Sequence, residues 1–260
     1  MEENSSPSRK WIRTKMTEAV IWSTRKVCTL QPTSTTRRRI CVPVLHLLRR
    51  NNQLRKKPGA VGIGLCDSQC KLQILMTLIC RRAATEDAPA IAELASTLQL
   101  RAGDDIGHAV SQGFLVFAKP REAYELRFAV SQYCVVALEE EQIVGFLIAH
   151  DKAELEALGS NLGYMQTLKD YLFSLSYPHW IYIDQIAVDS NFQHKGIGQK
   201  MHDFLFANAP DSVLIAGVTH MPVPNERSLG FFTKNGHMLK KELQEGEWLC
   251  GMYVRETGTR

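Results

Sequence analysis

The sequence contains no apolar run long enough to cross a bilayer. The longest, LQILMTLIC (residues 72–80), is about half of the roughly 20 residues that a transmembrane helix requires. The sequence therefore predicts no membrane span and no membrane partner.

The seven cysteines form no recognisable metal-binding pattern. Cys66 and Cys70 have a ligand-like spacing, but no second pair follows at the spacing of a zinc site. An odd number of scattered cysteines without a secretory signal favours reduced thiols in a cytosol-like, cytoplasmic compartment. We expect no metal ion.

Acidic residues are scarce at the start of the chain. Residues 1–75 contain 15 Lys or Arg and four Asp or Glu, which leaves 16 basic and 23 acidic residues in the remainder. The formal net charge of +4 is therefore the sum of about +11 in residues 1–75 and about −7 in the remainder, and the two parts of the chain are interpreted separately.

Residues 1–77 are predicted to form a basic, disordered extension, because they show no sustained helical or strand periodicity. Their Ser, Thr and Arg content resembles a transit peptide, although two Glu residues at the very start argue against one. A second interpretation is an arm that contacts nucleic acid. A third is that the segment is not part of the working protein, because Met76 directly precedes the first recognisable element. We favour the third interpretation or plain disorder, and disfavour nucleic acid, because only Trp11 and Trp22 interleave with the basic residues.

Residues 78–256 predict one α/β domain. LICRRAA (78–84) is typical of a strand, and residues 85–100 predict a helix with Thr85 as its N-cap. The other expected elements are a helical region within 106–131, a hairpin over 133–152, a helix within 151–178, a strand over 179–188, a helix from about Gly198, a strand over 212–220, a short helix over 225–236 and a closing hairpin over 236–256. The order β-α-α-β-β-(insert)-β-α-β-α-β-β implies a mixed sheet.

The stretch QHKGIG (193–198) stands where a strand pattern gives way to a helical one. No GxxxxGK[ST] motif is present, and Met201 occupies the third glycine position of GxGxxG. A tight connection is the commoner explanation of an isolated G-x-G. Consecutive backbone N–H groups that lead into a helix N-terminus, with Lys195 alongside, also suit a pyrophosphate. The residues therefore indicate a phosphorylated ligand without identifying it.

Three segments resemble the GNAT superfamily of acyl-CoA N-acyltransferases. IAVDSNFQHKGIGQKMHDFL (186–205) is similar to its central motif, in which an Ala-Val pair precedes [Q/R]-x-x-G-x-[G/A] and a helix. CRRAATEDAPAIAELA (80–95) resembles the family's first strand and helix, and NERSLGFFTKNGH (225–237) resembles its late asparagine-containing helix. The resemblance covers residues 78–256 and implies an N-acetyltransferase domain with a mixed, mostly antiparallel central sheet flanked by helices.

By this resemblance, acetyl-CoA is the cosubstrate and one strand diverges from the next, so that free backbone groups bind the pantetheine arm and polarise the thioester carbonyl. The residues implied to bind the coenzyme are Ile186, Ala187, Val188, Gln193, His194, Lys195, Gly196, Ile197, Gly198, Asn225, Ser228 and Phe232. For Asn225 an equally good interpretation is a helix N-cap. Ser228 serves chiefly as a small residue that permits close approach.

Asp184 and Tyr182 are the candidate catalytic residues, because family members often place catalytic side chains at these two strand positions. Two-residue alternation puts both on one strand face with Ile186 and Val188. An attacking amine must be neutral, so a general base assists it. A carboxylate in so apolar a strand has a raised pKa unless it is paired. The alternative is that Asp184 pairs with a Lys or Arg, or bonds the backbone.

The sequence departs from the family at two positions. Phe232 matches the tyrosine that usually reprotonates the leaving thiolate, and phenylalanine cannot donate a proton; His237 replaces the customary aromatic residue. His194, His202 and His220 show no metal-ligand spacing and are interpreted as solvent or loop residues. The aromatic residues within 151–178 are interpreted as core, with an amine-binding role as the alternative.

The implied function is transfer of an acetyl group from acetyl-CoA to a primary amine by direct attack on the thioester. The alternative is a catalytically weak acyl-CoA-binding module of the same fold, which Phe232 makes conceivable. The expected partner is a small-molecule or peptide amine acceptor, and the expected assembly is a monomer or homodimer. The fold alone does not choose among acceptors.

Overall fold

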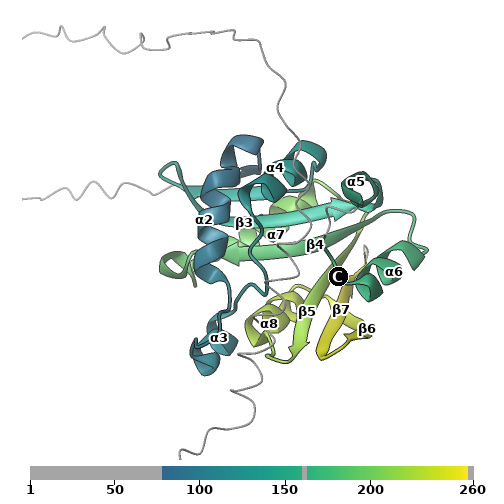
Figure 1. The fold of residues 1–260 in the computed structure, drawn as a ribbon. Coiled ribbons are helices and arrows are strands. Elements are labelled where there is room, and N and C mark those ends of the chain that lie inside the picture. The colour runs from purple at the N-terminus through teal and green to yellow at the C-terminus, as the bar shows by residue number, and fades with distance from the viewer. Residues whose placement is uncertain (1–77, 160–162, 257–260) are drawn as a thin grey trace, which may run out of the picture. The chain divides into compact units, whose positions relative to one another are not determined.

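The computed structural model describes residues 78–159 and 163–256 (Figure 1). The predicted extension, residues 1–77, lies outside the described residues. The helices are α2 (Ala88–Leu98), α3 (Ile106–Gln112), α4 (Arg121–Val130), α5 (Lys152–Leu158), α6 (Gln166–Ser174), α7 (Ile197–Ala207) and α8 (Glu226–Lys234), with the short 3-10 turns η1 (Thr85–Asp87) and η3 (Ser190–Phe192). The strands are β1 (Ile79–Arg82), β2 (Val135–Glu139), β3 (Gln142–Asp151), β4 (Trp180–Val188), β5 (Val213–Met221), β6 (Met238–Glu245) and β7 (Trp248–Arg255).

Within the described residues, seven strands form one sheet in the order β1-β2-β3-β4-β5-β7-β6. β4 and β5 pair in parallel, and every other neighbouring pair in that sheet is antiparallel. The prediction of a mixed, mostly antiparallel sheet is confirmed.

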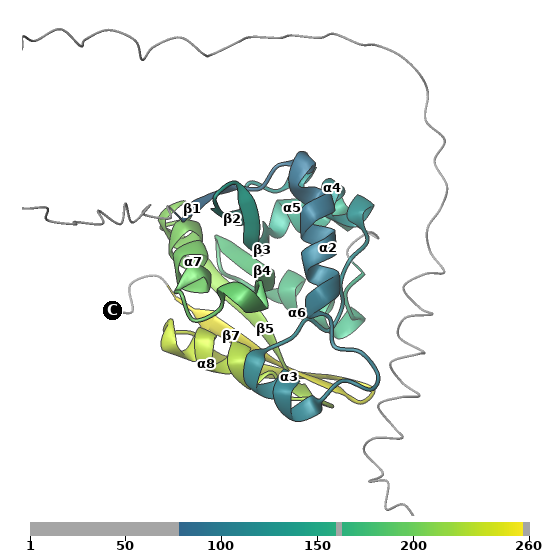
Figure 2. The same cartoon turned by 90° about the vertical axis from the view of Figure 1, so that its left-hand side faces the viewer.

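Helices cover both faces of the sheet. α7 and α8 lie on one face, and α2, α4 and α5 lie on the other (Figure 2). The α7 side is filled by a core that includes Ile197, Met201 and Leu205, whose spacing places them on one face of the helix. On the opposite face, one cluster packs α2 and α4 against β2 and β3, and another packs α5 and α6 against β4, β5 and β7.

α7 comes unusually close to β3 at Gly145. A Cβ there would lie 3.0 Å from the carbonyl oxygen of Ala187 and 3.2 Å from the terminal methyl of Met201. The missing side chain therefore lets α7, β3 and β4 pack tightly at this point.

Several local predictions are wrong in detail. Thr85 is not the helix N-cap: it opens η1, and α2 starts after Asp87, whose carboxylate binds the Arg81 guanidinium at 2.7 and 2.8 Å. The helix expected within 151–178 is α6, and the sequence missed α5, which Asp151 caps with a reciprocal bond to Glu154 and which Gly159 ends with φ +50°.

Among the described residues, no helix combines the length and apolar character needed to cross a membrane. Over the same residues, no group of three or more His, Cys, Asp and Glu side chains is placed to hold a metal ion.

Candidate active site

The parallel ladder between β4 and β5 stops halfway along both strands. It runs from the pair Trp180–Val213 to the pair Ile183–Ala216. Beyond that point β4 continues beside β3, while β5 continues beside β7. The two strands therefore diverge, as the family resemblance implied, and their facing backbone edges border an opening in the sheet.

Asp184 marks the point of divergence. On β3, Ile148 pairs with Gln185 and the next residue, Ala149, pairs with Ile183, so Asp184 is the extra residue of a β-bulge. The bulge reverses the alternation of side chains. Tyr182 packs with the α5 and α6 cluster, whereas Ile186 packs with the α7 cluster on the opposite face. The prediction that Asp184 and Tyr182 share a strand face with Ile186 and Val188 is therefore wrong.

The loop between β4 and α7 has the backbone geometry of an anion-binding turn. His194 has φ +63° and Gly196 has φ +76°, and α7 begins at Ile197. Left-handed residues among right-handed ones turn successive N–H groups toward one side, and the helix N-terminus adds its partial positive charge. Only glycine adopts the Gly196 conformation without cost.

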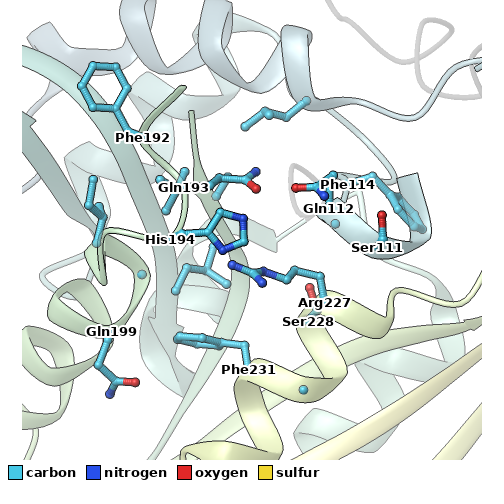
Figure 3. Close-up of a pocket in the computed structure, with 18 of the residues that line it drawn as sticks. Ser111, Gln112, Phe114, Phe192, Gln193, His194, Gln199, Arg227, Ser228 and Phe231 are labelled. Atoms are coloured by element: carbon cyan, nitrogen blue, oxygen red, sulfur yellow. The ribbon is translucent and has the colours of Figure 1, made fainter. Parts of the chain in front are cut away.

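This loop opens onto a cavity of about 660 Å³. Its walls come from the end of β4, the loop into α7, one face of α8 and the stretch from the end of α3 to Leu115 (Figure 3). Nine of the predicted coenzyme residues line it: Ile186, Ala187, Val188, Gln193, His194, Gly196, Ile197, Gly198 and Ser228. The structure thus brings together most of the residues that the sequence singled out.

Three predicted coenzyme residues do not line the cavity. The side chain of Lys195 points away from the cavity, with Nζ 3.6 Å from Glu139 and 4.5 Å from the centre of the Phe192 ring.

Phe232 is only 3% exposed and packs in the α7 core, and it is the preceding Phe231 that faces the cavity. Asn225 caps α8 by accepting the N–H of Ser228 at 3.1 Å.

Sequence reasoning missed the part of the opposite wall that follows α3, and it missed Arg227 on α8. The Asn225 side-chain amide donates to the carbonyl oxygen of Phe114 at 2.9 Å, which ties α8 to the segment after α3. A Cβ at Gly113 would come within 3.1 Å of the Arg227 side chain, so the two segments are in close contact. Arg227 and His194 extend toward the same space from opposite walls (Figure 3). No sequence signal linked residues so far apart along the chain.

Asp184 lies outside this cavity, in a buried ionic cluster on the α4 face of the sheet. Its Oδ2 is 3.4 Å from Lys119 Nζ and 3.7 Å from Arg127 Nε, and the three side chains are 9%, 14% and 1% exposed. Burial acts to raise the pKa of Asp184, but the attraction of Lys119 and Arg127 prevails and the pKa is lowered. The alternative foreseen for Asp184, pairing with a Lys or Arg, is what the structure shows.

Two tyrosines border this cluster. The rings of Tyr164 and Tyr182 are 5.6 Å apart, and Lys119 Nζ lies 5.6 Å from the centre of the Tyr164 ring. Burial raises the pKa of both phenols well above the ordinary value, and the charge of Asp184 adds to the effect. Both phenols therefore stay protonated at neutral pH. An ideal Cβ at Gly217 would lie 3.1 Å from the Tyr182 hydroxyl, so Gly217 leaves room for this group beside β5.

The interpretation of His202 as a solvent or loop residue is wrong. Its ring is fully buried on α7, and its Nε2 lies 3.1 Å from the Nε2 of His237. Burial lowers the pKa of His202 to about 4 and that of His237 to about 3, so both rings are neutral and one donates to the other. His220 lies on β5, with Nδ1 2.9 Å from Glu242 and Nε2 3.0 Å from the hydroxyl of Tyr253.

The chain belongs to the acetyltransferase (GNAT) family, whose model matches residues 106–237, about half of the chain. A comparison with curated proteins finds no match. Similar solved structures include Arabidopsis thaliana Naa50 in complex with a bisubstrate analogue (12% identity, 69% of this chain and 98% of that chain, TM-score 0.46). Others are an N-acetyltransferase of Staphylococcus aureus (17%, 70% and 99%, 0.47) and the polyamine N-acetyltransferase of Drosophila melanogaster (14%, 69% and 100%, 0.47).

Proposed function

We propose that the protein transfers an acetyl group from acetyl-CoA to a primary amine, by direct attack of the amine on the thioester. The observation that carries this proposal is one cavity lined both by the anion-binding turn before α7 and by the end of β4 at its divergence from β5. Family membership supports the reaction class.

The residues present fit a coenzyme pyrophosphate. The backbone N–H groups at the start of α7 are fixed donors, and the missing side chain of Gly198 keeps the space before them open. A Cβ at Gly198 would project toward Phe231 at 3.5 Å and Val188 at 3.9 Å, both of which line the cavity. The guanidinium of Arg227, on the opposite wall, supplies a permanent positive charge for a phosphate group.

In this proposal the pantetheine arm lies along the end of β4, beside Ile186, Ala187 and Val188. Backbone groups that have no β5 partner past Ile183 bond the arm and stabilise the oxygen charge that develops on the thioester carbonyl. Holding the two reactants in this gap contributes the rest of the rate acceleration through positioning.

The amine approaches from the opposite face, where Asp184 stands at the divergence point. The ion pairs with Lys119 and Arg127 keep Asp184 ionised and make it a weak proton acceptor, so we assign it to orienting the amine rather than to removing its proton. Tyr182, protonated and directed at β5 near Gly217, supplies a hydrogen bond at the same gap. Because Phe232 carries no hydroxyl, the leaving thiolate takes its proton from water or from the amine.

A catalytically weak acyl-CoA-binding module is the second candidate, favoured by Phe232 and by the ion-paired state of Asp184. Thiol release from acetyl-CoA, measured with a panel of primary amines and checked by mass spectrometry of the products, separates the two. Amine-dependent release with an acetylated product supports the transferase. Saturable coenzyme binding without release for any amine supports the binding module.

A further inference from the structure

A lysine occupies the acceptor side of the proposed active site. The segment after α3 runs along β4: Leu115 lines the cavity together with Ala187, and the carbonyl oxygen of Phe117 accepts from the Gln185 side chain at 2.7 Å. Two residues later, Lys119 Nζ reaches the carboxylate of Asp184 at 3.4 Å. Lys119 therefore follows this segment from the cavity to the point where β4 and β5 diverge.

The position of Lys119 is fixed by neighbouring contacts. Its backbone N–H donates to the hydroxyl of Tyr124 at 3.4 Å, and that hydroxyl donates to the side-chain oxygen of Gln185 at 2.9 Å. Tyr164 covers the ammonium from the side. Only 14% of the Lys119 side chain is exposed, so the surrounding residues restrict its orientation and keep the ε-amine beside Asp184.

Charges of both signs act on the ammonium group of Lys119. The guanidinium group of Arg127 forms a second ion pair with the carboxylate of Asp184. Burial lowers the pKa of Lys119; the attraction of Asp184 opposes this effect and the repulsion of Arg127 adds to it. The other titratable groups that face the cluster are Tyr124, Tyr164, Tyr182 and His150.

We propose that Lys119 is itself an acetyl acceptor, so that the protein acetylates its own active-site lysine. The inference rests on the proposed binding of acetyl-CoA in the cavity. The ammonium first releases one proton to water, and the neutral amine attacks the thioester carbonyl carbon. The N–C bond forms and the C–S bond breaks. The coenzyme leaves as a thiolate, which takes the second proton from the nitrogen, and the products are acetyl-lysine and free coenzyme A.

Acetylation of Lys119 changes the charge and the space at the proposed binding site of an external amine. It removes one positive charge beside Asp184, which leaves the carboxylate to Arg127 and to the incoming substrate. The added acetyl group also fills space at the divergence point. The modified protein thus differs from the unmodified one in both the charge and the room offered to an acceptor.

The test is incubation of the full chain with acetyl-CoA, followed by intact-mass measurement and peptide mapping over time. Lys241, on the exposed edge strand β6, reports acetylation by chemistry in solution. We expect Lys119 to be acetylated at least tenfold faster than Lys241. In Gly198→Asp, whose carboxylate repels the pyrophosphate, the rate at Lys119 should fall to that at Lys241. Lys119→Arg keeps the positive charge and should lose the fast site while leaving Lys241 unchanged.

Calorimetric titration of acetyl-CoA into the same preparations distinguishes failure of the Lys119 proposal from failure of the proposed function. Coenzyme binding without acetylation at Lys119, or acetylation at Lys119 that is equally fast in Gly198→Asp, overturns the inference and leaves the proposed function standing. Absence of coenzyme binding by the folded protein overturns both. Circular dichroism of each variant confirms that it is folded before the comparison.

Discussion

Substitution of Gly198 by Ala should separate folding from coenzyme binding. The new methyl group meets Phe231, Val188 and Ile186 at 3.5, 3.9 and 4.0 Å, which are ordinary van der Waals distances. Gly198 is the second residue of α7 and has no left-handed backbone. Because alanine loses less backbone entropy than glycine in a helix, we expect a stability gain of up to about 0.5–1 kcal/mol.

The family motif accepts glycine or alanine at this position, so Gly198→Ala should bind coenzyme A within about threefold of the wild type. The carboxylate of Gly198→Asp should instead weaken coenzyme A binding at least about tenfold, which is about 1.4 kcal/mol. Thermal unfolding without ligand and calorimetric titration with coenzyme A measure the two effects on each variant, and the melting temperature of Gly198→Ala should rise by about 1–4 °C.

Gly107→Ala is a matched control, because Gly107 is also the second residue of a helix, α3, and also follows an isoleucine. Gly107 does not line the cavity, and a Cβ there meets only Asp105 Oδ1, at 3.4 Å. The control should leave coenzyme binding unchanged. Unchanged binding in Gly198→Asp would refute the reasoning that the backbone at this position receives the coenzyme pyrophosphate.

Three further predictions follow from the described contacts. Asn225→Ala removes the cap of α8 and the hydrogen bond to Phe114. The free energy of unfolding in urea should therefore fall by about 1–2 kcal/mol, and coenzyme binding should weaken. An unchanged urea midpoint would contradict a stabilising role for these two hydrogen bonds. Phe232→Tyr should cost about 1–3 kcal/mol, because its hydroxyl enters an apolar core; wild-type stability with faster thiol release would instead place that hydroxyl at the cavity. His202 and His237 have folded pKa values below the ordinary value of about 6.5, so the unfolded chain binds more protons and stability should fall from about pH 6.5 downward, by about 2 kcal/mol per ring at pH 5. The loss should shrink in His237→Asn, and an equal loss in both chains would contradict the assignment.

The parts of the fold that depend on local patterns were predicted from the sequence. The apolar spacing of Ile197, Met201 and Leu205 defined α7, and all three are buried in it. The acidic run before Gln142 predicted a hairpin, and Glu140 and Glu141 form its turn with φ +50° and +71°. Such features could be read because each depends on residues near one another in the chain.

The bulge at Asp184 could not be predicted, because β4 is covered by helices on both faces and its apolar residues show no alternation to interrupt. The ion pairs of Asp184 join residues about 60 positions apart, and no local pattern reports such contacts. The same holds for His202 and His237, which only the packing of α7 against the end of α8 brings within 3.1 Å. The sequence therefore predicted which residues gather around the loop before α7, but it did not predict the contacts of Asp184.

The central claim is that the turn before α7 binds the pyrophosphate of acetyl-CoA. The most direct test is calorimetric titration of acetyl-CoA, and separately of desulfo-coenzyme A, into the full chain and into Gly198→Asp. The account predicts binding of one coenzyme per chain by the wild type, for both ligands, and its loss in the variant, whose carboxylate lies among the phosphate donors. Absence of binding by the folded wild-type protein, or equal binding by the variant, would contradict the account.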